Sequence, residues 1–197
     1  MPFDFDAVIH KQYDILPLDP SLIKTTGEQK PQILWVGCSD SLVLETLTLD
    51  VQPEEIFVHR NLGNVVSNGD LSSESAVAWS VDLLKVKHIV VCGHYGCSLT
   101  KEKDPKALYG WSKDITKLHK LNDEFLELSD RKVDETSREH RLEEVYTLAE
   151  TDWLAKQPNV KAAIRERGLQ THAFIYDKDS NTCVRLVEKA KGGKPEI

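Results

Sequence analysis

Four side chains that could carry out chemistry together follow two apolar runs of the chain. They are Cys38, Asp40, His94 and Cys97. The first two follow the run 33–36 (Ile-Leu-Trp-Val), and the last two follow the run 89–92 (Ile-Val-Val-Cys). Apolar runs that end abruptly at a polar turn are typical of buried parallel strands. Since ligands of open α/β sheets bind at the carboxyl ends of the strands, we expect the four side chains at one sheet edge.

Two thiols and one imidazole are donors that Zn²⁺ prefers, and the His94-x-x-Cys97 spacing places two of them on one turn. Three protein ligands with a fourth position open are typical of catalytic zinc, whereas structural sites usually have four protein ligands. The alternative from the residues alone is two ordinary cysteines at strand ends and a loop histidine. The remaining cysteines, Cys92 and Cys183, lie in strand-like patterns and are expected to be inert core thiols.

The intervening segments predict an α/β domain with a mainly parallel sheet of four or five strands, flanked by helices. Strands are predicted at 33–36, 54–59, 88–92, 172–176 and 183–187, and helices at 43–48, 71–84 and 159–168. Residues 1–30 are predicted to form an N-terminal arm with one helical piece at 5–13. Residues 31–197 are predicted to form a single zinc-binding domain.

Composition limits the possible partners. The net charge of −7 and the scattered basic residues argue against nucleic-acid binding. No apolar run approaches the roughly 20 residues of a membrane span, and the N-terminus lacks the pattern of a signal peptide, so we expect a cytoplasmic protein without a membrane partner. A nucleotide-binding module is disfavoured because the loop 93–96 lacks a phosphate-binding motif. A redox role for Cys92 and Cys97 fails if Cys38 and Cys97 bind zinc.

Four motifs, in this order, resemble the β-class carbonic anhydrases of the fungal and plant-like branch. They are Gly37-Cys-Ser-Asp-Ser41, Phe57-Val-His-Arg-Asn61 with Asn64, Leu84-Lys-Val-Lys-His88 and Val91-Cys-Gly-His-Tyr-Gly-Cys97. The similarity is strong over residues 29–100 and looser over 145–187. It implies a zinc ion held by Cys38, His94 and Cys97, and hydroxide on that zinc adding to a small gaseous substrate, carbon dioxide. It also implies an obligate homodimer, often assembled into a tetramer, with active sites at the dimer interface.

The resemblance assigns roles to four further residues. Asp40 matches the carboxylate that orients the zinc-bound hydroxide, and Gln29 matches an amide that donates to the substrate oxygen. Phe57 and Leu62 match apolar walls of the substrate pocket. The alternative for Asp40 is helix capping, and for the two apolar residues it is plain core packing.

The sequence departs from the family pattern close to the expected site. The family motif is Cys-x-Asp-x-Arg, and Leu42 stands where the arginine would hold Asp40 in a bidentate pair. Ser98 and Leu99 replace a Gly-Gly pair, and Trp79 replaces a tyrosine. These changes are expected to make the substrate pocket bulkier and more apolar.

Two hypotheses follow from these departures. In the first, Asp40 is released from its arginine and becomes the fourth zinc ligand, which gives a closed, non-catalytic zinc site. In the second, a narrower and less polar pocket favours carbonyl sulfide over carbon dioxide, as in family relatives that hydrolyse carbonyl sulfide or carbon disulfide. The same hydroxide addition would then be followed by loss of hydrogen sulfide.

Overall fold

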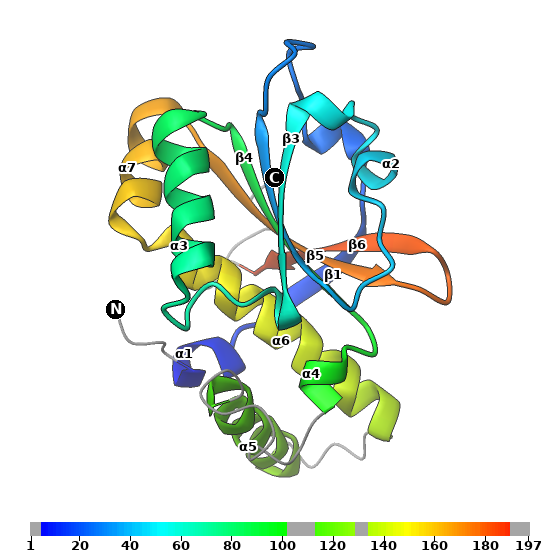
Figure 1. Cartoon of the computed structure of the whole chain (residues 1–197). Coiled ribbons are helices and arrows are strands. Elements are labelled where there is room, and N and C mark those ends of the chain that lie inside the picture. The colour runs from blue at the N-terminus through cyan, green and yellow to red at the C-terminus, as the bar shows by residue number, and fades with distance from the viewer. Residues whose placement is uncertain (1–4, 102–112, 129–133, 190–197) are drawn as a thin grey trace.

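The computed structural model describes residues 5–101, 113–128 and 134–189 (Figure 1). Within this part of the chain, six strands form one sheet in the order β1-β6-β5-β4-β2-β3. The strands are β1 (Tyr13–Pro17), β2 (Ile33–Cys38), β3 (Ile56–Asn61), β4 (His88–His94), β5 (Gln170–Asp177) and β6 (Thr182–Glu188). Strands β3, β2, β4 and β5 are parallel, whereas β6 and β1 run antiparallel to their neighbours. The predicted α/β fold with a mainly parallel sheet is confirmed.

Strands β2 and β4 form the centre of the sheet and are buried along their whole length. Because helices or loops cover both faces of a central parallel strand, its sequence is continuously apolar instead of alternating. Gly37 of β2 pairs with Cys92 of β4. This register brings the last residues of the two strands, Cys38 and His94, to the same edge of the sheet.

The described helices are α1 (Phe5–Ile9), α2 (Glu45–Leu49), α3 (Leu71–Ala78), α4 (Ser98–Lys101), α5 (Lys113–Leu128), α6 (Glu135–Ala155) and α7 (Pro158–Arg167). Some helices cover the two faces of the sheet, whereas α1, α4 and α5 pack with α6 beyond the carboxyl edge of the sheet (Figure 1). Short helical turns lie at Pro20–Leu22, Pro53–Glu55 and Leu62–Asn64, and α3 continues as a π-helical turn over Trp79–Leu83. Helices α3, α6 and α7 pack on one face, against a cluster that includes Leu34, Ile89 and Val91 (Figure 1). Helix α2 and the turn at Pro20–Leu22 cover the opposite face.

The N-terminal segment is part of the same sheet. The helix α1 ends at Ile9, so the helical piece predicted at 5–13 is shorter than expected. Strand β1, which the sequence analysis did not predict, pairs with β6 from Tyr13↔Glu188 to Pro17↔Val184. Pairing with β6 explains the shorter helix, because the chain must become extended before Tyr13, where that pairing begins. No helix in the described ranges has the length and apolar character that a membrane crossing requires.

Candidate metal centre

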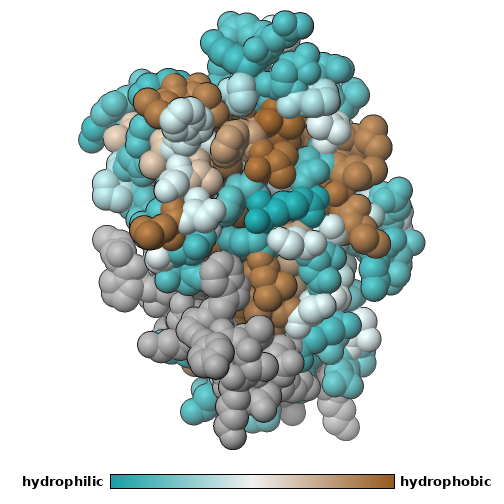
Figure 2. Space-filling view, viewed as in Figure 1, coloured by the Kyte–Doolittle hydropathy of each residue, from teal (hydrophilic) through white to brown (hydrophobic). Residues whose placement is uncertain are grey.

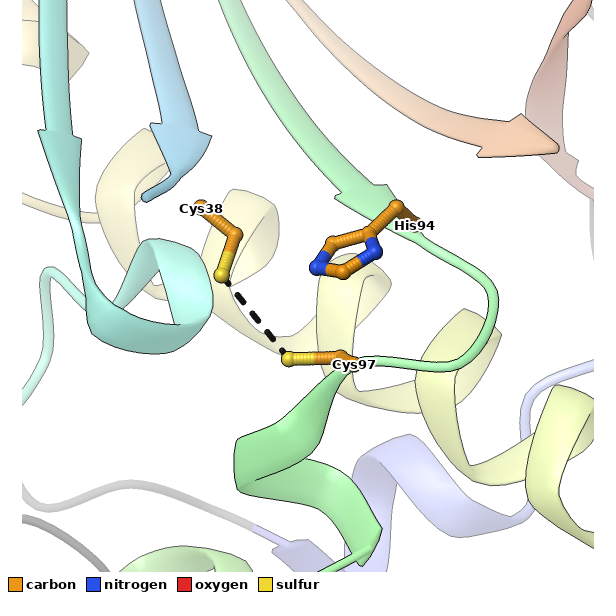
Figure 3. Close-up of side chains that lie close together, drawn as sticks. All are labelled: Cys38, His94 and Cys97. Atoms are coloured by element: carbon orange, nitrogen blue, oxygen red, sulfur yellow. Dashed lines mark hydrogen bonds between the residues drawn. The ribbon is translucent and has the colours of Figure 1, made fainter. Parts of the chain in front are cut away.

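Cys38, His94 and Cys97 lie together at the carboxyl edge of the sheet, and their side chains point toward one another (Figure 3). The candidate ligand atoms of the three residues all lie within 4.8 Å of one another, and all three residues are buried. Cys38 ends β2, His94 ends β4, and Cys97 follows β4 by one tight turn before α4. Gly96 permits this turn because its φ of 79° lies in the left-handed region.

The spacing of these atoms fits a zinc ion. The two Sγ atoms are 3.8 Å apart, and tetrahedral zinc with Zn–S bonds of about 2.3 Å requires a sulfur–sulfur distance of about 3.8 Å. The Nε2 atom of His94 is buried and has no hydrogen-bond partner among the described residues. A buried polar atom without a partner is costly, and a metal ligated by that nitrogen would remove the cost. The donor set and its geometry therefore fit zinc.

The surroundings of Cys38 favour its thiolate. Its pKa is lowered to about 4, first by the hydrogen bond from the Cys97 thiol and further by His94 and two main-chain N–H groups. These N–H groups belong to Asp40 and Gly63, and they lie 3.4 and 3.2 Å from the sulfur. Burial acts in the opposite direction and is outweighed. Because metal ligation requires the thiolate, the site is prepared for a cation.

Glu143 of α6 supports the turn that carries Cys97, a role that the sequence analysis missed. Its Oε1 atom accepts hydrogen bonds from the N–H groups of Gly96 and Cys97 and from the Thr100 hydroxyl, at 2.8, 2.9 and 3.0 Å. The residue is only 2% exposed, and burial raises its pKa to about 7. Charged positions within a helical pattern normally predict a solvent-facing surface, so no sequence signal indicates that this carboxyl group lies inside.

Arg60, at the end of β3, holds the segment that follows Cys38. Its guanidinium donates to the carbonyl groups of Cys38, Ser41 and Val43, at distances between 2.8 and 3.1 Å. It also forms an ion pair of 2.7 Å with Glu45 of α2. The segment 38–43 therefore has an arginine anchor even though Leu42 replaces the arginine of the family motif.

Asp40 lies beside the cluster but is not part of it. Its Oδ2 atom accepts a hydrogen bond of 2.8 Å from the N–H of Ser98. Hydrogen bonds from Ser98 hold the pKa of Asp40 below its usual value. Leu42 is 72% exposed, so in the single chain it faces solvent and does not form a pocket wall.

Two of the predicted pocket residues do lie beside the candidate metal ligands. Leu99 is 1% exposed and belongs to the same apolar cluster as Cys38 and Cys97, and Leu62 packs against that cluster. A Cβ atom on Gly63 would lie 2.2 Å from Leu99 Cδ2, so this leucine fills the space directly over the glycine. Ser98 is exposed and contributes its main-chain N–H to Asp40.

Three predicted site residues are not brought to the cluster within one chain. Gln29 is exposed and precedes the start of β2, whereas Cys38 is the last residue of that strand. Because a six-residue strand is about 20 Å long, Gln29 lies at least that far from Cys38, at the amino-terminal edge of the sheet. Phe57 pairs with Leu34 near the start of β2, and it packs against the apolar cluster under α3. Trp79 lies in the π-helical turn that continues α3, and it is 52% exposed. Sequence order alone could not separate residues near the metal in one chain from residues presented elsewhere on its surface.

A model of the carbonic anhydrase family matches residues 33–183 of this chain. A carbonic anhydrase of Emericella nidulans is 34% identical over 165 residues, which make up 81% of this chain and 71% of that protein. A carbonic anhydrase of Candida albicans is 33% identical over 154 residues, or 76% of this chain. The match spans 54% of the length of the Candida protein.

Solved structures agree with this match. The β-carbonic anhydrase CafD of Aspergillus fumigatus superposes with a TM-score of 0.76 at 28% identity, covering 88% of this chain and 99% of that chain. A tetrameric β-carbonic anhydrase of Sordaria macrospora superposes with a TM-score of 0.70 at 34% identity, covering 87% of this chain and 85% of the other. Because the family model matches residues 33–183, most of this chain, and two cysteines and one histidine cluster at the sheet edge, the chain belongs to the β-carbonic anhydrase family.

Proposed function

We propose that this protein is a zinc enzyme that hydrates carbon dioxide to bicarbonate. The observation that carries the proposal is the cluster of Cys38, His94 and Cys97, whose ligand atoms lie within 4.8 Å of one another at the carboxyl edge of a parallel sheet. Zinc bound there would activate water as a nucleophile at neutral pH. The relatives named carbonic anhydrases support the same activity.

The role proposed for Asp40 is to orient the attacking water by accepting a hydrogen bond from it. The Ser98 N–H holds one carboxylate oxygen of Asp40 and leaves the other for this role. Asp40 lies outside the metal cluster, which favours an open fourth position over the closed site in which Asp40 is the fourth ligand. Glu143 and Arg60 position the two segments that carry the cysteine ligands.

We further propose that the active unit is a homodimer. Gln29, Phe57 and Trp79 can contribute to a substrate pocket only if a second copy brings them to the cluster. A surface suited to such contact lies over α2, β3 and α3, where Figure 2 shows several hydrophobic patches. The large exposed hydrophobic side chains in these elements or next to them in the chain are Leu42, Leu44, Leu47, Val58, Leu71, Trp79 and Leu83. Pairing of dimers into a tetramer is proposed by analogy with the Sordaria enzymes.

Carbonyl sulfide is the second candidate substrate. The observation that favours it is Leu99, which occupies the space over Gly63 next to the two cysteine ligands. A bulky apolar residue there disfavours a hydrated, polar substrate and suits a linear, weakly solvated one. The missing arginine at position 42 leaves Asp40 with less support for carbon dioxide hydration.

Side-by-side measurement of kcat/KM for carbon dioxide and carbonyl sulfide on the zinc-loaded protein tests both candidates. We expect turnover of at least one gas, and loss of both activities in the Cys38→Ala variant while Cys183→Ala keeps them. No turnover of either gas in a zinc-replete dimer contradicts the proposed function. Faster turnover of carbon dioxide than of carbonyl sulfide rejects carbonyl sulfide as the preferred substrate. Leu42→Arg should raise carbon dioxide hydration, and Leu42→Met serves as the matched control without a guanidinium.

A further inference from the structure

A cavity lies at the edge of the sheet opposite the metal cluster. Its volume is about 510 Å³, which falls within the usual range for small-molecule sites. It opens between the start of β5 and the end of β6, and the second half of α6 forms one of its walls. No residue of the metal centre lines it.

The cavity exists because β5 and β6 separate at this end. Their pairing runs from Asp177↔Thr182 to Ala173↔Leu186 and stops there. Beyond Leu186, β6 stays paired with β1 up to Tyr13↔Glu188, and Lys11 forms an ion pair with Glu188. The start of β5 stays instead with β4, to which it is paired from Gln170 onward.

This separation leaves main-chain groups facing the cavity. The N–H of Gln170 donates to the Lys87 carbonyl on the β4 side. In a parallel pair, successive residues point their N–H and C=O groups to alternate sides, so those of Thr171 point toward β6. On β6, the N–H of Lys189 donates to the Gln12 carbonyl on the β1 side, so the main-chain groups of the preceding residue, Glu188, point toward β5. Thr171 and Glu188 would form the next pair of the ladder, and within the described residues that pair is not made.

One permanent positive charge faces the cavity. Arg185 is half-buried, and it is the only lysine or arginine among the lining residues. It has no hydrogen bond or ion pair with any residue in the described ranges. The neighbouring His172 is neutral at physiological pH, because burial lowers its pKa to about 3.

Both carboxylates in the lining, those of Asp152 and Glu188, already lie in ion pairs with lysines. Lys11 lies 3.4 Å from Asp152 and also contacts Glu188. Lys156, which directly follows α6, lies 2.7 Å from Asp152. With both carboxylates neutralised, the charge of Arg185 is the one left for a ligand, and that ligand should be an anion.

The rest of the lining combines the uncharged polar residues Thr151, Gln170 and Thr171 with several apolar side chains. Leu22, Leu148, Ala155 and Leu186 contribute to the walls. An inorganic anion would leave these walls in contact with water, whereas a ligand with a hydrocarbon body would cover them.

We propose that this cavity binds a small organic monocarboxylate with an apolar body of several carbons. The carboxylate is held by the Arg185 guanidinium and by the N–H groups of Thr171 and Glu188, and the hydrocarbon body lies against Leu148 and Leu186. The cavity is separate from the metal centre, so a test that rejects this proposal would not contradict the proposed hydration activity.

Hexanoate binding to the zinc-loaded full chain, measured by titration calorimetry, tests this proposal. We expect Arg185→Gln to weaken binding by about ten-fold or more, since a charge-assisted contact is lost. Arg165→Gln, an exposed arginine on α7, should have no effect. Ala155→Phe keeps Arg185 but fills the cavity, and it should abolish binding. The amide resonances of Thr171 and Glu188 should shift on titration.

The results that would overturn the proposal are equally specific. They are no hexanoate binding, equal affinity in Arg185→Gln and the native chain, or equal affinity for hexanol, which lacks the charge. Binding that persists in Arg185→Gln and Ala155→Phe but is lost in His94→Ala would place the carboxylate at the metal and also reject the proposal. Thermal unfolding of each variant confirms that it is folded before the comparison is made.

Discussion

Removing the Glu143 carboxyl group should weaken zinc binding without touching a zinc ligand. Its Oε1 atom accepts three hydrogen bonds, two of them from the turn that carries Cys97. In Glu143→Ala the three donors lose their acceptor in a site that is almost fully buried. Each orphaned donor costs about 1–3 kcal/mol, and part of that cost falls on the unligated fold. The remaining cost should weaken zinc binding by about 10–100-fold, which is the usual effect of losing a hydrogen-bond partner that supports a metal ligand.

The assay is competition for zinc between the protein and a chromogenic chelator, together with the rate of zinc release. Glu143→Gln keeps an oxygen acceptor at the same place, so its zinc affinity should stay within about three-fold of the native value. Glu139→Ala, one turn earlier on α6, removes a long 3.8 Å contact with Lys101 and should leave zinc affinity unchanged.

Two results would refute this reasoning. One is a folded Glu143→Ala protein with native zinc affinity, which would mean that the Cys97 turn holds its shape without the carboxylate. The other is a Glu143→Gln protein as weak as Glu143→Ala, which would mean that charge matters and acceptor geometry does not.

Three further predictions concern stability. Arg60→Met should lower the free energy of unfolding by about 2–3 kcal/mol in urea titrations, because three carbonyl contacts and the Glu45 pair are lost. The same change at the exposed Lys30 should cost about 0.5 kcal/mol or less, and equal losses at both positions would contradict the role of Arg60. His172 has a folded pKa of about 3, below its ordinary value, so the unfolded chain binds the extra proton and native stability falls as pH drops below 6.5. Between pH 7 and pH 5, the free energy of unfolding should therefore fall by about 1–2 kcal/mol less in His172→Asn than in the native protein. Equal falls in the two proteins would contradict the lowered pKa of His172. Zinc removal by chelator dialysis should lower the thermal midpoint, since metal at about 1,000 times its Kd adds about 4 kcal/mol to stability; an unchanged midpoint would mean that these side chains bind no zinc.

The metal cluster could be predicted because its positions follow from chain topology. Two apolar runs with a helical pattern between them make parallel neighbours, and residues that end such strands share one edge. Cys38 and His94 meet for this reason, and the short turn to Cys97 follows from Gly96. Strand β1 was harder to predict, because it is a short edge strand that ends at Pro17 and shows little alternation.

The supporting residues could not be predicted because their chemistry is unusual for their pattern. Glu143 and Glu150 occupy charged positions of a long helix, yet both are buried. Glu150 accepts the N–H groups of Val66 and Ser67, so it holds the loop that follows Gly63. Helical periodicity predicts that charged positions face solvent. These two glutamates are buried because loops pack against the helix, which the pattern does not show. Gln29 illustrates a different limit, since only the proposed dimer, and not the single chain, would bring it to the metal cluster.

Zinc K-edge X-ray absorption on the purified, dialysed protein tests the central claim most directly. We predict one zinc per chain, with two sulfur neighbours at about 2.3 Å and lighter neighbours at about 2.0–2.1 Å, as two cysteines and one histidine require. The claim is contradicted if the dialysed protein retains no zinc, or if the metal has only oxygen and nitrogen neighbours.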